Sequence, residues 1–250
     1  MSLPPAFTRL RRRPRVVGHR GVRRPDLPEN TLSAFAAAIE EGAEALELDA
    51  RPCATGELVV LHDPTLERVT GGLDLRAAAD LSLAELTRVE LPRGEHVPTL
   101  VEALTFARAR GLPVNVELKH DVPSRRAIVQ AAARLFGSWD RRHPILVSSF
   151  DPPILAALRA LVPRVPIAML VEPKWQRVTL PAIAPLGAAA VHLERTLTRP
   201  ETIANLKARG YGVAVWTVND PREARDLAEL GVDAIITDDP ATIRQALEGN

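Results

Sequence analysis

Residues 43–49 read Ala-Glu-Ala-Leu-Glu-Leu-Asp, which predicts a short buried strand with carboxylates at its C-terminal end. The same arrangement recurs where Glu117 and Lys119 end a second apolar run. Side chains two residues apart in a strand point to the same face, so Glu47 projects with Asp49 and Glu117 with Lys119. A buried carboxylate without a partner costs several kcal/mol, so three converging carboxylates indicate a bound cation.

Short apolar runs alternate with helical patterns along nearly the whole chain. Eight strands, each followed by a helix, are expected at residues 15–19, 43–49, 113–119, 145–149, 165–170, 188–193, 212–217 and 233–237. These runs are continuously apolar, as in sheets that are covered on both faces. We therefore predict an α/β protein with a (β/α)8 TIM-barrel fold. An open doubly wound sheet is the alternative, but the first strand is not followed by Gly-x-Gly-x-x-Gly.

Turn and capping residues support the same assignment. Glycines follow five helical patterns, at Gly42, Gly111, Gly187, Gly210 and Gly231, where helix C-caps are expected. Asp-Pro pairs at residues 220–221 and 239–240 predict helix starts. We also predict that Asn30 is the N-cap of the first helix.

One segment interrupts the alternation. About fifty residues separate the second strand from Leu100, too many for an ordinary loop. They include an extra strand at 57–62 and a short helix near 82–87. We expect a single domain over residues 1–250 with an inserted subdomain at about 57–98, over the mouth where barrel active sites form.

Composition excludes several classes of function. The net charge is +1, so no global field favours nucleic acid, and no apolar run reaches the ~20 residues of a membrane span. Cys53 is the only cysteine, which fits a cytoplasmic protein. We interpret Arg11, Arg12 and Arg13 as part of a solvated N-terminal tail. The sequence does not determine the oligomeric state.

The ionisable residues at the strand ends point to phosphoryl chemistry. Glu47, Asp49 and Glu117 offer hard oxygen ligands, which suit one Mg²⁺ or Ca²⁺ better than zinc. His19 and His62 can transfer protons near neutral pH. A metal ion neutralises phosphate charge in such chemistry.

Two cations complete this set, because Arg20 and Lys119 are suited to hold an anion beside the metal. Other residues have weaker signals. Glu29 is either a metal ligand or a group at the helix entry, and Asp238 is a candidate to hydrogen-bond within the site. We expect a structural role for His192. We expect no catalysis from the loop histidines His96, His120 and His143.

These motifs in this order resemble the glycerophosphodiester phosphodiesterase family of the bacterial cytoplasmic type. The resemblance covers nearly the whole chain. It is carried by Val-Gly-His-Arg-Gly at 17–21, Pro-Glu-Asn-Thr-Leu at 28–32, Glu-Leu-Asp at 47–49, Leu-His-Asp-Pro-Thr-Leu-Glu-Arg-Val-Thr at 61–70, Val-Glu-Leu-Lys at 116–119, Ser-Ser-Phe at 148–150, Trp-Thr-Val-Asn at 216–219 and Gly-Val-Asp-Ala-Ile-Ile-Thr-Asp at 231–238.

The resemblance implies metal-dependent hydrolysis of a glycerophosphodiester to sn-glycerol 3-phosphate and an alcohol. It matches His19 and His62 to the acid–base pair, and Trp216 to an aromatic residue on the glycerol or alcohol side. It also matches Arg20 and Lys119 to phosphate contacts and the three carboxylates to metal ligands. Alternatives are a lysophospholipase-D-like enzyme, a phosphodiesterase that forms a cyclic phosphate, and a non-catalytic barrel that binds phosphorylated polyols. The preferred alcohol and the acid and base assignments stay open.

Overall fold

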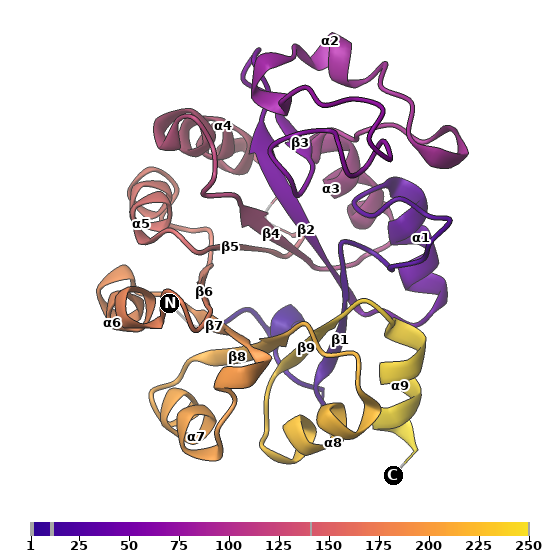
Figure 1. Cartoon of the computed structure of the whole chain (residues 1–250). Coiled ribbons are helices and arrows are strands. Elements are labelled where there is room, and N and C mark those ends of the chain that lie inside the picture. The colour runs from indigo at the N-terminus through magenta and orange to yellow at the C-terminus, as the bar shows by residue number, and fades with distance from the viewer. Residues whose placement is uncertain (1–2, 11–12, 141, 250) are drawn as a thin grey trace.

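The computed structural model describes residues 3–10, 13–140 and 142–249. Eight of its strands run parallel: β1 (Arg15–His19), β2 (Ala45–Pro52), β4 (Val114–Leu118), β5 (Ile145–Ser149), β6 (Ile167–Val171), β7 (Ala190–Glu194), β8 (Gly212–Trp216) and β9 (Ala234–Thr237). Their order is β1-β9-β8-β7-β6-β5-β4-β2, and pairing between β1 and β2 closes the barrel. Figure 1 shows the helices as a ring around it. The predicted TIM barrel is confirmed.

Eight helices cover the outside of the barrel: α1 (Leu32–Glu40), α3 (Leu100–Ala109), α4 (Arg125–Ser138), α5 (Pro152–Leu161), α6 (Gln176–Leu186), α7 (Pro200–Ala208), α8 (Pro221–Glu229) and α9 (Pro240–Glu248). The main core lies between them and the strands, because the outward strand residues and the inward helix residues are both apolar. The predicted helix starts are confirmed, since Asp220 and Asp239 accept hydrogen bonds from backbone N–H groups of α8 and α9.

The prediction for Asn30 is wrong. The N-cap of α1 is Thr31, whose hydroxyl accepts from the backbone N–H of Ala34 at 3.2 Å. Asn30 has a positive φ of 60°, and its amide donates instead to Asp49 at 2.9 Å. An Asn followed by Thr offers two capping residues, and only the tertiary contact with β2 decides between them.

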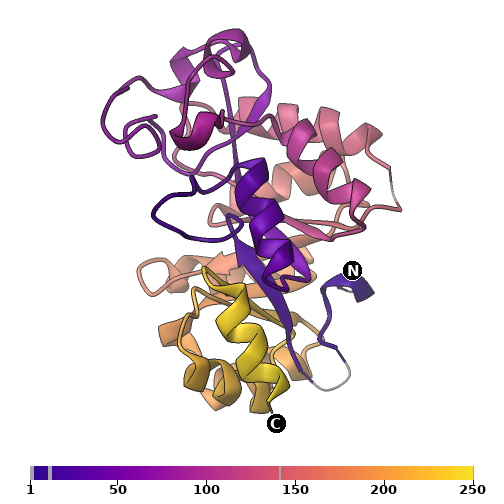
Figure 2. The ribbon, with the colours of Figure 1, turned by 90° about the vertical axis from the view of Figure 1, so that its right-hand side faces the viewer.

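The N-terminal segment closes the end of the barrel where the strands begin. Phe7 ends a short 3₁₀ helix (η1, Pro5–Phe7) and belongs to a buried cluster with Leu146, Ala168 and Ala190. Figure 2 shows this segment at the right of the barrel, away from the segment around α2 (Leu83–Leu86). Arg13 pairs with Glu44 at 2.8 Å, so its predicted solvation is wrong; Arg11 and Arg12 lie outside the described residues.

The segment between β2 and α3 has a small core of its own. β3 (Leu58–Val60) pairs antiparallel with β2, as a short hairpin beyond the barrel. Buried side chains from β3 and from the residues between β2 and α3 on either side of it form a separate apolar cluster: Cys53, Val59, Leu61, Leu66, Val69, Ala78, Leu81, Leu86, Val89, Leu91 and Val97. Figure 1 places this segment at the rim of the barrel. Among the described helices, none is long and apolar enough to cross a bilayer.

Candidate active site

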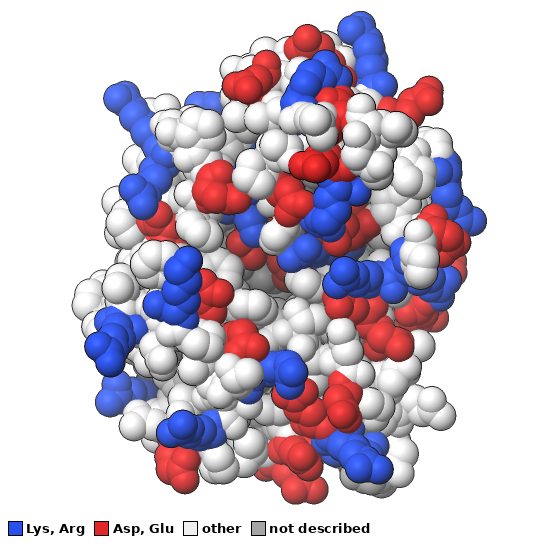
Figure 3. All heavy atoms as spheres, viewed as in Figure 1, with Lys and Arg blue, Asp and Glu red and all other residues white. Residues whose placement is uncertain are grey.

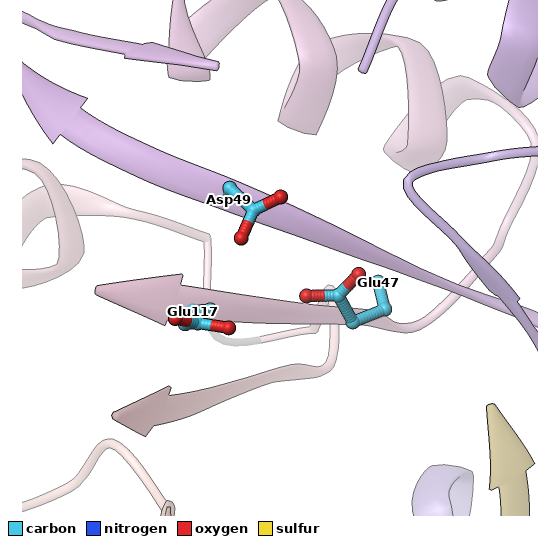
Figure 4. Close-up of side chains that lie close together, drawn as sticks. All are labelled: Glu47, Asp49 and Glu117. Atoms are coloured by element: carbon cyan, nitrogen blue, oxygen red, sulfur yellow. The ribbon is translucent and has the colours of Figure 1, made fainter. Parts of the chain in front are cut away.

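Three buried carboxylates meet on β2 and β4: Glu117 lies near the C-terminal end of β4, whereas Glu47 and Asp49 lie within β2, which continues to Pro52 and so extends beyond the strand end that the sequence predicts. Asp49 and Glu117 are register partners on these neighbouring strands, and Glu47 lies two residues before Asp49 on the same face. One carboxylate oxygen from each residue lies within 4.8 Å of the others. Figure 4 shows the three groups facing a common space. The i, i+2 spacing and the parallel register together produce this convergence.

The electrostatics of the cluster are those of a cation site. Burial raises the pKa of Glu47 well above its ordinary value, and the neighbouring charges of Asp49 and Glu117 raise it further. Burial would also raise the pKa of Asp49, but Lys119 and Arg20 outweigh it and lower that pKa. A divalent ion would relieve the remaining repulsion. Oxygen donors alone are what Mg²⁺ and Ca²⁺ prefer, so these residues fit such an ion.

Two cations border the carboxylates. The Lys119 ammonium lies 2.8 Å from Glu117 and 3.3 Å from Asp49. Burial lowers its pKa, but the two carboxylates outweigh burial and raise that pKa to about 12. Arg20 follows β1, and its Nε lies 3.1 Å from Asp49. Both side chains stay charged at neutral pH and lie beside the space that the carboxylates face.

The two predicted histidines each have a carboxylate partner. His19 Nδ1 lies 2.7 Å from Asp238, and His62 Nδ1 lies 2.5 Å from Asp63. An ionised carboxylate only accepts hydrogen bonds, so each Nδ1 carries its proton and each Nε2 is left for another partner. Both histidines line the same cavity. Burial, followed by the charges of nearby cations, lowers the pKa of His62.

The structure places several supporting residues that the motifs did not assign. Asp238 is itself held by Asn219, which donates to one carboxylate oxygen at 3.0 Å and accepts from the Asp238 backbone N–H at 2.9 Å. Asn30 and Asp49 form a similar reciprocal pair. The hydrogen bond expected for Asp238 is thus present. Asp63 stands directly after His62, and this adjacency was the one local signal for its role.

The cavity extends from the charged groups to an aromatic wall. Its volume is about 280 Å³, and Phe150 and Trp216 line it with rings 5.6 Å apart, edge to face. His120 also lines it and packs on Phe150, so a loop histidine from which we expect no catalysis borders the cavity. Figure 3 shows a hollow at the centre of this face with acidic and basic side chains next to it. His192 is buried and lines a separate cavity together with Leu3 and Phe7; its structural role stays a prediction.

Gly21 allows the first loop to lie against α1. Its φ is +90°, and a Cβ there would lie 2.6 Å from the carbonyl carbon of Ala34. We expect Gly21→Ala to lower the free energy of unfolding by about 3 kcal/mol, because both the backbone strain and the clash oppose the native loop. Urea denaturation measures this change.

Gly137 in α4 is the matched control, because no described atom lies within 4 Å of a Cβ at that position. Gly137→Ala is expected to raise the free energy of unfolding by at most about 0.5–1 kcal/mol, since Gly137 is the penultimate residue of α4 and the preference for alanine is largest in a helix interior. A Gly21→Ala protein as stable as the parent would contradict the close approach.

Comparison with known proteins adds independent evidence. Residues 19–242 match the model of the Glycerophosphoryl diester phosphodiesterase family. A glycerophosphodiester phosphodiesterase of Caldanaerobacter subterraneus subsp. tengcongensis is 30% identical over 240 residues, which are 91% of this chain and 95% of the relative. One from Bacillus altitudinis is 28% identical over 239 residues, with 90% and 95% covered.

A solved structure shares the fold closely. A phosphodiesterase from Oleispira antarctica, solved in complex with the product sn-glycerol-3-phosphate, superposes with a TM-score of 0.85. The two sequences are 28% identical, and the match covers 94% of this chain and 97% of the other.

Proposed function

The chain belongs to the glycerophosphoryl diester phosphodiesterase family and is an enzyme of that class, and from this premise we propose that it hydrolyses glycerophosphodiesters by metal-dependent acid–base catalysis. The products would be sn-glycerol 3-phosphate and an alcohol. One observation carries the proposal: three buried carboxylates offer oxygens within 4.8 Å of one another, and two of them, Glu47 and Glu117, line a cavity that is also lined by His19, His62, Arg20 and Lys119. A barrel that only binds polyols would not need two proton-transfer groups beside a cation site.

Glu47, Asp49 and Glu117 would hold one divalent cation, Mg²⁺ or Ca²⁺. When bound, such an ion neutralises phosphate charge and polarises a phosphoryl oxygen. Arg20 and Lys119 would bind the remaining phosphate oxygens. The carboxylates already balance part of the positive charge of Arg20 and Lys119. The single negative charge of a phosphodiester would therefore be enough to balance the rest.

The two histidines would move the protons. The lowered pKa of His62 keeps it neutral near pH 7, the form that accepts a proton, so we assign it the base. Its Nε2 would take the proton of the nucleophile, either water or the neighbouring glycerol hydroxyl. As the bond between phosphorus and the alcohol oxygen breaks, Nε2 of His19 would give its proton to that oxygen.

The aromatic wall would determine where the organic parts of the substrate lie. Trp216 is oriented by its indole N–H, which donates to the His192 carbonyl at 3.1 Å. This contact leaves the ring surface for the glycerol or alcohol part. Leu73 and Leu75 in the inserted segment are exposed. A lysophospholipid is therefore the second candidate substrate.

A substrate panel tests these assignments. The chelated protein would be assayed on glycerophosphocholine, glycerophosphoinositol and a lysophosphatidylcholine, with Mg²⁺, Ca²⁺ or Mn²⁺ added back. We expect metal-dependent release of glycerol phosphate from the first two at a kcat/KM above that for the lysolipid. Phosphorus NMR would identify a cyclic phosphate if the glycerol hydroxyl attacks first. Absence of hydrolysis with every metal would refute the proposed function.

We also propose that residues 57–98 form an inserted subdomain beside the mouth, on the evidence of their separate apolar cluster.

A cytoplasmic location is supported by the single buried thiol of Cys53, since a lone cysteine fits a reducing compartment. The proposed partner is a small glycerophosphodiester rather than nucleic acid. Fractionation of cells and peptide mass mapping after limited proteolysis would test the location and the subdomain.

A further inference from the structure

Arg68 joins two loops that border the cavity. Its Nη2 donates to Glu29 at 2.9 Å, and its Nε donates to Asp63. Glu29 belongs to the loop between β1 and α1, whereas Asp63 and Arg68 belong to the inserted segment, in the part that follows β3. One guanidinium therefore links segments that are 39 residues apart in sequence.

Both acceptors of Arg68 also hold groups assigned to the reaction. Glu29 accepts from Arg20 Nη1 at 3.0 Å, and Asp63 lies 2.5 Å from His62 Nδ1. Arg20, Glu29, Arg68 and Asp63 thus form a continuous chain of alternating charge that ends at His62, and we call these five residues the Arg68 network. The network connects Arg20, the proposed phosphate contact, to His62, the proposed base. The contacts of the Arg68 side chain are with Glu29 and Asp63, neither of which is a proposed metal ligand.

The Arg68 network differs from an ordinary surface pair. Only 13% of the Glu29 side chain is exposed; burial raises its pKa, but Arg68 and Arg20 outweigh burial and lower that pKa. For Asp63, Arg68 and His62 likewise outweigh burial and lower the pKa to about 2. The Arg68 side chain itself is 43% exposed, and an exposed ion pair contributes at most about 1 kcal/mol to stability, whereas a misplaced catalytic group can cost about 100-fold in rate.

We infer that Arg68 is a positioning residue, which orients Arg20 through Glu29 and His62 through Asp63. Because Arg20 and His62 have these roles only under the function proposed above, the inference rests on that function. Without the guanidinium, Glu29 has Arg20 as its remaining ion-pair partner and draws it away from the phosphate. Asp63 then holds His62 alone, and no second contact limits its rotation.

The first test compares Arg68→Ala with Arg76→Ala in steady-state assays. Arg76 lies in the same inserted segment, and its side chain pairs with Asp74, two residues away, rather than with a group assigned to the reaction. We expect Arg68→Ala to lower kcat/KM by about 10–100-fold, with KM raised and kcat lowered, since both a phosphate contact and a base are displaced. Arg76→Ala should change kcat/KM less than twofold.

The pH profile separates positioning from general destabilisation. Asp63, Asp49, Lys119 and Arg20 are the charged groups that act on His62. Loss of the Arg68 cation leaves Asp63 free to favour protonated His62, so the apparent pKa of the base should rise in Arg68→Ala. A purely structural role would lower the melting temperature and leave this apparent pKa unchanged.

Two further variants keep the inference falsifiable if Arg68→Ala does not fold. Arg68→Lys retains a charge but cannot reach both carboxylates as a fork does, so it should recover only part of the lost kcat/KM. Asp63→Asn combined with Arg68→Lys should cost less than the sum of the two single effects, because the Asp63 contact is common to both changes whereas the Glu29 contact is affected only by Arg68→Lys.

Parent-like kcat/KM in Arg68→Lys, or strict additivity with Asp63→Asn, would overturn the inference. Failure of the proposed function is distinguishable, because then the unmodified protein would not release glycerol phosphate from any tested diester with any metal.

Discussion

Replacement of His62 by alanine is expected to lower kcat on a glycerophosphodiester by about 10²–10⁴-fold, the range typical for loss of a general acid or base. The imidazole lines the cavity, and its Nδ1 is bound to Asp63, so Nε2 is the only ring atom left for the nucleophile. The substitution should leave KM nearly unchanged, since Arg20 and Lys119 retain their contacts. Steady-state kinetics with saturating metal measures both constants.

The matched control is His96→Ala. His96 is exposed and lies near Glu102 at 3.8 Å, and it does not line the cavity. We expect its kcat to stay within twofold of the parent, and both variants to keep the parent circular dichroism spectrum. Near-parent turnover by the His62 variant would contradict its assignment as the base.

Removal of the divalent ion is expected to abolish activity, and Glu47→Gln should lower kcat/KM by at least about 100-fold even at high metal concentration. The amide is nearly the same size as the carboxylate but carries no charge. It also relieves repulsion with Asp49 and Glu117, which is strong in the buried cluster without an ion. Folding should therefore survive the substitution while metal binding does not.

Thermal denaturation distinguishes these two effects. Mg²⁺ or Ca²⁺ should raise the melting temperature of the parent in proportion to the logarithm of its concentration, because the ion binds the folded state. The melting temperature of Glu47→Gln should not respond. Glu57→Gln is the control, since Glu57 is a surface residue of the inserted segment, and its response should match the parent. Full activity of the parent after exhaustive chelation would refute the cation site.

Much of the fold could be predicted because its determinants are local. Apolar runs of strand length, helix-capping Asp-Pro pairs and glycines with positive φ depend on a few adjacent residues. Each predicted strand is present, and no predicted strand end differs from the observed one by more than three residues. The pairs Glu47 with Asp49 and Glu117 with Lys119 follow from the strand period alone. The inserted segment was visible as a connection too long for a loop.

The supporting contacts could not be predicted because they cross the barrel. Asp238 reaches His19 over 219 residues, and only the pairing of β1 with β9 makes them neighbours. Asn30 could cap a helix or bind Asp49, and local propensity favours the cap that the structure assigns to Thr31. The sequence around Arg68 in the inserted segment has no strand or helix period from which its contact with Glu29 could be predicted.

The amino-acid sequence by itself determined which side chains end strands and which of them share a face, because strand period and apolar patterning act over a few residues. The tertiary structure alone decided which strand ends meet. It brought Glu117 opposite Asp49. It also placed both His19 and His62 in the lining of the cavity, each with a carboxylate hydrogen-bonded to its Nδ1. Closure and register of a parallel barrel depend on pairing between distant segments, and that pairing is a property of the whole chain.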